Sequence, residues 1–169
     1  SSKNIKRPEQ ELEVLNNVFK ESTHEFEKLC EKLDLNVKFI GDYSSLKDET
    51  TKEIKELNNK NPTARLTVYI CLGYDGRQEI IDGINRLIKN GKKEINEEEF
   101  RNYLYDKDMI DPEIIIRTSG VSRLSGFLLY QATYSELFFV EKLWPEITTE
   151  DVDKIIEDYQ NNVNRKFGK

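Results

Sequence analysis

Apolar side chains recur every three or four residues along several stretches of the chain, and this spacing predicts amphipathic helices. The longest stretch begins just after Pro8, a residue that suits a first helical turn, and places eight residues on one stripe: Leu12, Leu15, Val18, Phe19, Phe26, Leu29, Cys30 and Leu33. Shorter helices are predicted from residue 44 or 45 to about 60, from 77 to 89, from 96 to 105, from 127 to 133 and from 149 to about 165. In the helix from 77 to 89 we expect one apolar side, formed by Ile80, Ile81, Ile84, Leu87 and Ile88.

Short, almost continuously apolar runs lie between these helices and predict strands that are buried on both faces. They are residues 37–40, 66–72, 114–116 and 137–140. Alternation of such strands with helices predicts an α/β fold with a mostly parallel central sheet and helices on both faces. No repeat or linker interrupts the pattern, so we expect residues 1–169 to form one domain.

Polar segments follow three of the predicted strands, at residues 41–42, 73–77 and 117–125. In a parallel sheet built from right-handed crossovers, the carboxyl ends of the strands share one edge. Ligands of such sheets bind beyond that edge, so we expect the functional groups there.

Composition excludes several classes of protein. The net charge of −6 disfavours a general nucleic-acid binder, since that function needs a basic face. A zinc site is not expected, because the chain has two isolated cysteines, Cys30 and Cys71, and a single histidine. The two cysteines are expected to be small core residues. No apolar run approaches the roughly 20 residues that cross a bilayer. A nucleotide-binding domain is disfavoured because neither GxGxxG nor a P-loop follows any strand.

The segment Arg117 to Ser125 carries the most chemical information, because two arginines and several hydroxyls follow a buried strand and precede a predicted helix. Guanidinium groups bind phosphate oxygens in pairs, and hydroxyls with free N–H groups at a helix start would complete an anion cradle. Composition alone leaves open a second interpretation, a surface loop whose arginines pair with carboxylates.

The same region resembles the signature of the cis-prenyltransferases, the family of undecaprenyl diphosphate synthase. The resemblance rests on RTSG at 117–120, RLSGFLLYQ at 123–131, YSELFF at 134–139 and LWP at 143–145. It extends to residues 1–8, to IGD at 40–42, to GRQEI at 76–80 and to the C-terminal residues 159–160 and 167–168, and so covers essentially the whole chain. It implies condensation of isopentenyl diphosphate with an allylic diphosphate to give a longer chain with a cis double bond.

By resemblance, the residues that hold the isopentenyl diphosphate are Arg117, Arg123 and Ser125, and Glu136 helps to hold Mg²⁺. A carboxylate near arginines fits this role because Mg²⁺ takes hard oxygen ligands and bridges to diphosphate oxygens. From the sequence alone, without the resemblance, an ordinary solvated carboxylate is the favoured interpretation of Glu136. Arg77 matches an arginine of the family, but a structural role explains it equally well.

The resemblance also assigns roles near the N-terminus, where Asn4 would assist proton removal from isopentenyl diphosphate and Arg7 would contact diphosphate. Two neighbours depart from the family pattern. Lys3 stands where the family has glutamate, and Ile5 stands where it has tryptophan. The second departure leaves closure over the substrate and the identity of the allylic substrate open.

Nothing in the chain matches the strand and the aspartate-containing loop with which the family begins. We therefore expect a fragment of a longer protein, inactive by itself. The resemblance implies a cytoplasmic homodimer that works at the membrane surface on a lipid product. A non-catalytic subunit of a cis-prenyltransferase complex is one alternative, disfavoured by the presence of Arg117 and Arg123. An enzyme that couples two five-carbon units irregularly is another.

Overall fold

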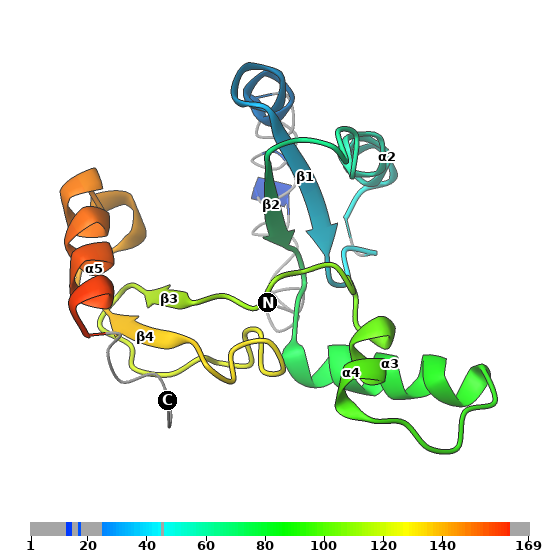
Figure 1. Cartoon of the computed structure of the whole chain (residues 1–169). Coiled ribbons are helices and arrows are strands. Elements are labelled where there is room, and N and C mark those ends of the chain that lie inside the picture. The colour runs from blue at the N-terminus through cyan, green and yellow to red at the C-terminus, as the bar shows by residue number, and fades with distance from the viewer. Residues whose placement is uncertain (1–12, 15–16, 18–24, 45, 163–169) are drawn as a thin grey trace. The chain divides into compact units, whose positions relative to one another are not determined.

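A computed structural model describes residues 13–14, 17, 25–44 and 46–162, and it divides the chain into two compact units (Figure 1). Unit 1 is Ser1–Lys107 and unit 2 is Asp108–Lys169. Within the described residues, no helix is both long enough and apolar enough to span a membrane. Each unit contains one pair of strands and is described by itself below.

Unit 1 is built on strands β1 (Leu35–Ile40) and β2 (Leu66–Cys71), which pair in parallel. Their register runs without interruption from Leu35 opposite Leu66 to Ile40 opposite Cys71. Both strands were predicted, with their ends shifted by one or two residues. The parallel pairing confirms the predicted type of sheet.

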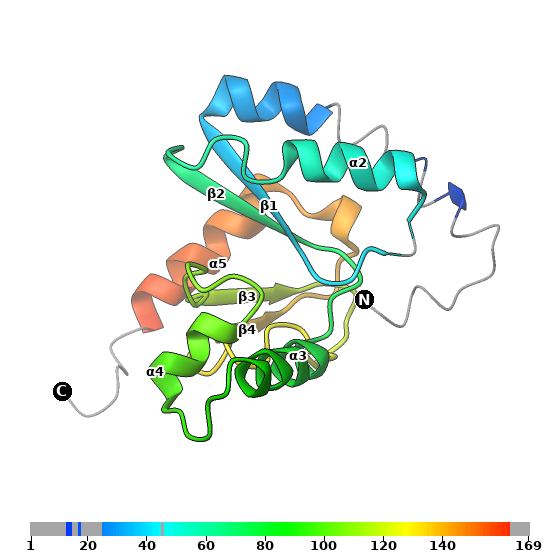
Figure 2. The ribbon, with the colours of Figure 1, turned by 90° about the vertical axis from the view of Figure 1, so that its right-hand side faces the viewer.

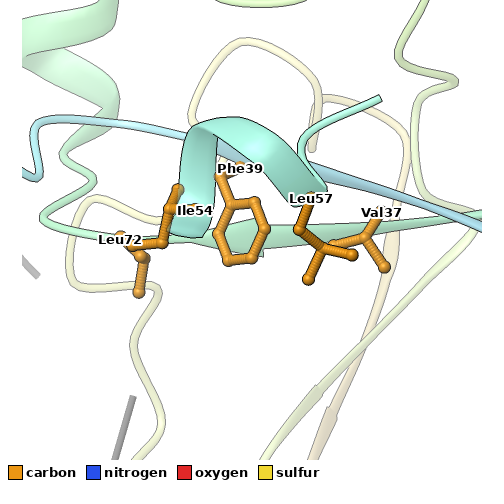
Figure 3. Packing of buried hydrophobic residues seen from close by; sticks show 5 residues of the cluster. All are labelled: Val37, Phe39, Ile54, Leu57 and Leu72. Carbon is orange, nitrogen blue, oxygen red and sulfur yellow. The ribbon is translucent and has the colours of Figure 1, made fainter. Parts of the chain in front are cut away.

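One side of this strand pair is covered by two helical segments, residues 25–33 and α2 (Asp48–Leu57) (Figure 2). Figure 3 shows how the side chains of α2 reach the strands; the buried cluster consists of Val37, Phe39, Ile54, Leu57 and Leu72. Phe26 and Cys30 from the first helical segment pack against it. Cys30 is therefore a core-facing residue, as the sequence predicted, and it is a free thiol like Cys71.

The outer edge of β1 is closed by the turn that follows α2. The Phe39 N–H donates to the Asn58 Oδ1 at 2.8 Å, and the Asn59 N–H donates to the Val37 carbonyl at 2.8 Å. Asn59 adopts a left-handed φ of 58°, which a short polar side chain tolerates better than most. These bonds satisfy backbone groups that would otherwise be exposed at a strand edge.

The rest of unit 1 consists of α3 (Gly76–Lys89), α4 (Glu97–Phe100) and the 3₁₀ helix η2 (Arg101–Tyr103). The predicted apolar side of α3 is buried only in part, because Ile81, Ile84 and Ile88 are exposed among the described residues. The residues buried on α3 are instead Gly76, Glu79, Gly83 and Leu87. A Cβ on Gly83 would lie 3.1 Å from the Phe100 ring and from the Tyr103 carbonyl, so the absence of a side chain permits this packing.

Unit 2 contains strands β3 (Ile114–Arg117) and β4 (Glu136–Phe139), the 3₁₀ helix η3 (Trp144–Glu146) and α5 (Thr149–Asn162). The two strands are parallel, as predicted, with Ile114 opposite Glu136 and Arg117 opposite Phe139. On α5, Ile155 is buried and the adjacent Ile156 is exposed.

Two predicted helices differ from the structure. The expected helix over residues 127–133 is a series of turns, because Ser125, Gly126 and Leu128 have φ values of 53°, 85° and 44°, which interrupt a right-handed helix. The helix predicted from residue 44 or 45 to about 60 is shorter, since α2 begins at Asp48. Ser44 does not cap it; its N–H and hydroxyl donate to Asp42 Oδ1 instead.

Candidate functional site

Arg117 is the last residue of β3, at the carboxyl end of the β3–β4 pair. The Val140 N–H donates to the Arg117 carbonyl at 2.8 Å, so pairing continues past the end of β4 and fixes the backbone of Arg117. The side chain is half-buried. Sequence and structure therefore agree that an arginine stands where a buried strand ends.

Residues Arg117–Gly120, called the arginine turn below, reverse the chain through two left-handed residues. Ser119 has a φ of 75° and Gly120 a φ of 64°. The Ser119 N–H donates to the Lys142 carbonyl at 2.9 Å, and the Gly120 N–H donates to the Val140 carbonyl at 3.0 Å. The expected contribution of free N–H groups to an anion cradle is therefore wrong for these two residues, whose amides are already used.

Arg123 and Ser125 lie further along the same segment, among the turns that replace the predicted helix, and both are exposed. Ser125 and Leu128 are non-glycine residues in the left-handed region, as is Ser119. Each costs on the order of 1–2 kcal/mol relative to ordinary backbone. Strained backbone of this kind concentrates at ligand-binding and catalytic segments.

The two arginines of this segment carry charges that the described part of unit 2 does not neutralise. Neither the Arg117 nor the Arg123 guanidinium forms a salt bridge or a side-chain hydrogen bond among the described residues. The alternative of a surface loop held by arginine–carboxylate pairs therefore finds no support there.

A neighbouring cation behaves differently. The Lys142 Nζ lies 2.7 Å from both carboxylate oxygens of Asp151 in the first turn of α5. The hydrogen bond from Lys142, helped by the Thr148 N–H, lowers the pKa of the Asp151 carboxyl to about 2. The lysine charge is thus balanced locally, whereas neither guanidinium has such a partner among the described residues.

The carboxylates of unit 2 are distributed over both ends of the strand pair. Glu136 begins β4 opposite Ile114, three residues from the level of Arg117, which corresponds to about 10 Å at the usual rise per strand residue. Within this chain the structure does not bring Glu136 beside the arginine turn. Glu141 is there instead: a Cβ on Gly120 would lie 2.6 Å from Glu141 Oε2. The sequence analysis did not single out Glu141.

The described residues contain no group of three or more His, Cys, Asp or Glu side chains that could hold a metal ion by themselves. Single carboxylates of the described residues fit Mg²⁺ only in the manner common for substrate-bound Mg²⁺. In that arrangement one carboxylate, water molecules and phosphate oxygens are the ligands.

In unit 1, the turns after β1 and β2 lie side by side, as the shared edge of a parallel sheet predicts. A Cβ on Gly41 would lie only 2.1 Å from the Leu72 carbonyl oxygen and 3.0 Å from the Tyr74 nitrogen, so glycine is needed at this close approach. Asp75 caps α3 by accepting from the N–H groups of Arg77 and Gln78. Arg77 is exposed at the start of that helix, and segment 117–125 belongs to the other unit.

Glu79 anchors the turn after β2 and is another residue that the sequence analysis missed. Its side chain is only 1% exposed. It accepts hydrogen bonds from the Tyr74 hydroxyl and, at 3.0 Å, from the Tyr105 N–H. Burial, together with the hydrogen bond to Glu79, raises the pKa of Tyr74 well above its usual range. The available signal was a carboxylate on the same helical face as Gly76, Gly83 and Leu87.

The two predicted N-terminal site residues, Asn4 and Arg7, lie outside the described residues. Their roles stay predictions.

Guanidinium groups that have no carboxylate partner among the described residues, at and just beyond the carboxyl end of a parallel strand, suit a phosphorylated ligand. The family model described as putative undecaprenyl diphosphate synthase matches residues 1–168. The chain belongs to this family and is a cis-prenyltransferase. The predicted family and reaction class are thereby confirmed.

Individual relatives agree with this assignment. An isoprenyl transferase of Thermotoga maritima is 40% identical over 173 residues, which cover 99% of this chain and 74% of the relative. A tritrans,polycis-undecaprenyl-diphosphate synthase (geranylgeranyl-diphosphate specific) of Picrophilus torridus is 42% identical over 179 residues, covering 99% and 69%.

Two solved structures share the fold. A probable undecaprenyl diphosphate synthase from Campylobacter jejuni has a TM-score of 0.80 at 33% identity and is matched over 99% of this chain and 79% of that chain. Lavandulyl diphosphate synthase from Lavandula x intermedia, in complex with dimethylallyl diphosphate, has a TM-score of 0.85 at 23% identity, over 94% and 72%. The predicted α/β fold class is confirmed by these similarities.

Proposed function

We propose that the protein condenses isopentenyl diphosphate with an allylic diphosphate in the cis configuration and makes a polyprenyl diphosphate, the precursor of a lipid carrier. In this proposal, Arg117, Arg123 and Ser125 hold the diphosphate group of isopentenyl diphosphate. The observation that carries it is a pair of guanidinium groups, on a strained segment that begins at the carboxyl end of β3, with no salt bridge to any other described residue.

The chemistry of these side chains suits a diphosphate. A planar guanidinium donates two parallel N–H bonds to neighbouring phosphate oxygens, and the Ser125 hydroxyl supplies a further donor. Each close charge pair contributes about 4 kcal/mol of Coulomb attraction at 4 Å and an effective dielectric constant of 20. Two arginines therefore bind and orient the diphosphate without the N–H groups of Ser119 and Gly120, which are already used.

We also propose that the reaction uses Mg²⁺, with Glu136 as a protein ligand, in keeping with the resemblance. When bound, the ion neutralises charge that develops on the leaving diphosphate. Asn4 is proposed to assist proton removal from isopentenyl diphosphate, and Arg7 to contact diphosphate. A homodimer that works in the cytoplasm at the membrane surface completes the proposal.

Steady-state kinetics of the full-length protein test the role of the arginines. We expect Arg117→Ala and Arg123→Ala each to raise the KM for isopentenyl diphosphate by about 10- to 100-fold, because each removes a charge-assisted pair of hydrogen bonds worth about 1.5–3 kcal/mol. Arg65→Ala is the matched control, since Arg65 is an exposed arginine that precedes β2 in unit 1.

An unchanged KM in both variants, with the fold retained by circular dichroism, would contradict the proposed site. Product analysis in the same assay distinguishes cis chain extension from irregular coupling of two five-carbon units. A branched product would replace the proposed reaction with the irregular one.

A further inference from the structure

The carboxylate of Glu141 lies against the arginine turn, in the space that a side chain on residue 120 would occupy. A Cβ built on Gly120 would lie 2.6 Å from Oε2, 3.3 Å from Cδ and 3.7 Å from Oε1 of Glu141. The carboxylate therefore covers Gly120 closely, and the left-handed glycine makes room for it.

The backbone on both sides of Glu141 is held in place. The carbonyls of Val140 and Lys142 accept the hydrogen bonds of the Gly120 and Ser119 N–H groups, so residues 140–142 and the arginine turn are tied together. Lys142 is in turn fixed to α5 through Asp151. The backbone of Glu141 is thus held beside the arginine turn.

Indeed, Glu141 forms no salt bridge within the described part of the chain. The arginine turn and its continuation therefore present two positive charges, Arg117 and Arg123, together with one fixed negative charge. A diphosphate bound by these arginines carries several negative charges. Glu141 therefore weakens its binding unless a cation balances the charge of the diphosphate.

We propose that Glu141 is the residue that makes diphosphate binding at the arginine turn depend on a divalent cation. This inference rests on the proposed function and adds a determinant to it. Removing the charge lowers the repulsion that a metal-free diphosphate meets. It also removes an oxygen toward which a diphosphate-bound Mg²⁺ is attracted. Within this chain Glu136 begins β4, three residues from the level of Arg117, and does not lie beside Gly120 as Glu141 does.

Calorimetric titration of the full-length protein with inorganic diphosphate measures the effect directly, once with a chelator and once with Mg²⁺. We expect metal-free diphosphate to bind Glu141→Gln about 3- to 10-fold more tightly than the unmodified protein. This factor corresponds to the loss of repulsion from one partly screened charge. The gain in affinity on adding Mg²⁺ should shrink by a similar factor. Glu141→Asp, which keeps the charge, should behave like the unmodified protein.

Glu157→Gln is the charge-matched control, because Glu157 is exposed on α5 and its loss changes the net charge equally. Equal or weaker metal-free binding by Glu141→Gln, or an equal effect of Glu157→Gln, would overturn the inference. Failure of the proposed function has a different signature: the unmodified protein would then bind diphosphate no better than Arg117→Ala under either condition.

Discussion

Glu79 is expected to be the most sensitive polar residue of unit 1. Its side chain is fully buried between α3 and the segment after η2, and it accepts hydrogen bonds from the Tyr74 hydroxyl and the Tyr105 N–H. The perturbation that we propose is Glu79→Ala, compared with Glu79→Gln, which has nearly the same shape.

The size of the effect follows from the partners that are left behind. Glu79→Ala deprives two donors, one of them on the buried Tyr74, of their acceptor, at about 1–3 kcal/mol each. The truncation also leaves a small cavity, at on the order of 1 kcal/mol. We expect a loss of about 3–6 kcal/mol in the free energy of unfolding, a large part of the roughly 5–15 kcal/mol that folded domains have.

Glu79→Gln keeps one carbonyl oxygen as an acceptor but turns an NH₂ donor toward another donor. We therefore expect an intermediate loss of about 1–3 kcal/mol. Glu98→Ala is the control, since Glu98 is an exposed acidic residue of α4, and a surface change of this kind should stay within about 0.5 kcal/mol.

Urea unfolding followed by far-ultraviolet circular dichroism gives the three values. Ultraviolet titration provides a second reading, because burial and hydrogen bonds to acidic partners raise the pKa of both Tyr74 and Tyr105. In Glu79→Ala the pKa of Tyr74 should fall toward its usual range. A loss below about 1 kcal/mol for Glu79→Ala, or a smaller loss than for Glu79→Gln, would refute this account of the cluster.

Two further predictions concern unit 1. In thermal unfolding, Gly41→Ala should destabilise the protein far more than Gly91→Ala. Both glycines have a positive φ, 111° and 72°, but only a Cβ on residue 41 would lie against backbone, 2.1 Å from the Leu72 carbonyl oxygen. Similar losses for the two variants would contradict the packing of the turns. Burial raises the pKa of the Cys71 thiol from 9.0 to about 11, so folding stability from this group is complete below pH 9 and is lost as the pH rises toward 11. Urea midpoints measured between pH 8 and 11 should fall by less in Cys71→Ala, and an unchanged slope in that variant would show that the thiol contributes nothing.

The sequence by itself determined the class of fold and the family. Runs such as residues 66–72 and 114–116 are almost continuously apolar and predicted strands correctly, although the start of β2 at Leu66 and Thr67 is exposed. The pattern of arginine, serine and glycine from Arg117 onward identified the family, because the residues of a binding segment are contiguous in the sequence. The ends of α3 at Asp75 and Asn90 were also predictable, since helix caps depend on residues that are neighbours in the sequence.

Only the tertiary structure decided how the polar groups are distributed in space. That Glu141 covers the arginine turn, whereas Glu136 lies at the opposite end of β4, follows from the register of β3 and β4, which residue types alone do not encode. The turns over residues 125–134 likewise replaced a helix because local φ values above zero overrode an apolar pattern.

The exposed isoleucines of α3 and the buried Glu79 have the same physical origin. Helical periodicity tells which residues share a face, but the partner segments decide which face is buried. Here η2, the Phe100 ring and Tyr105 pack against the face that carries Gly83 and Glu79. Two hydrogen bonds compensate the burial of the carboxylate. Contacts between segments that are distant in the sequence therefore set the polar interior of this protein, while its sequence sets the framework.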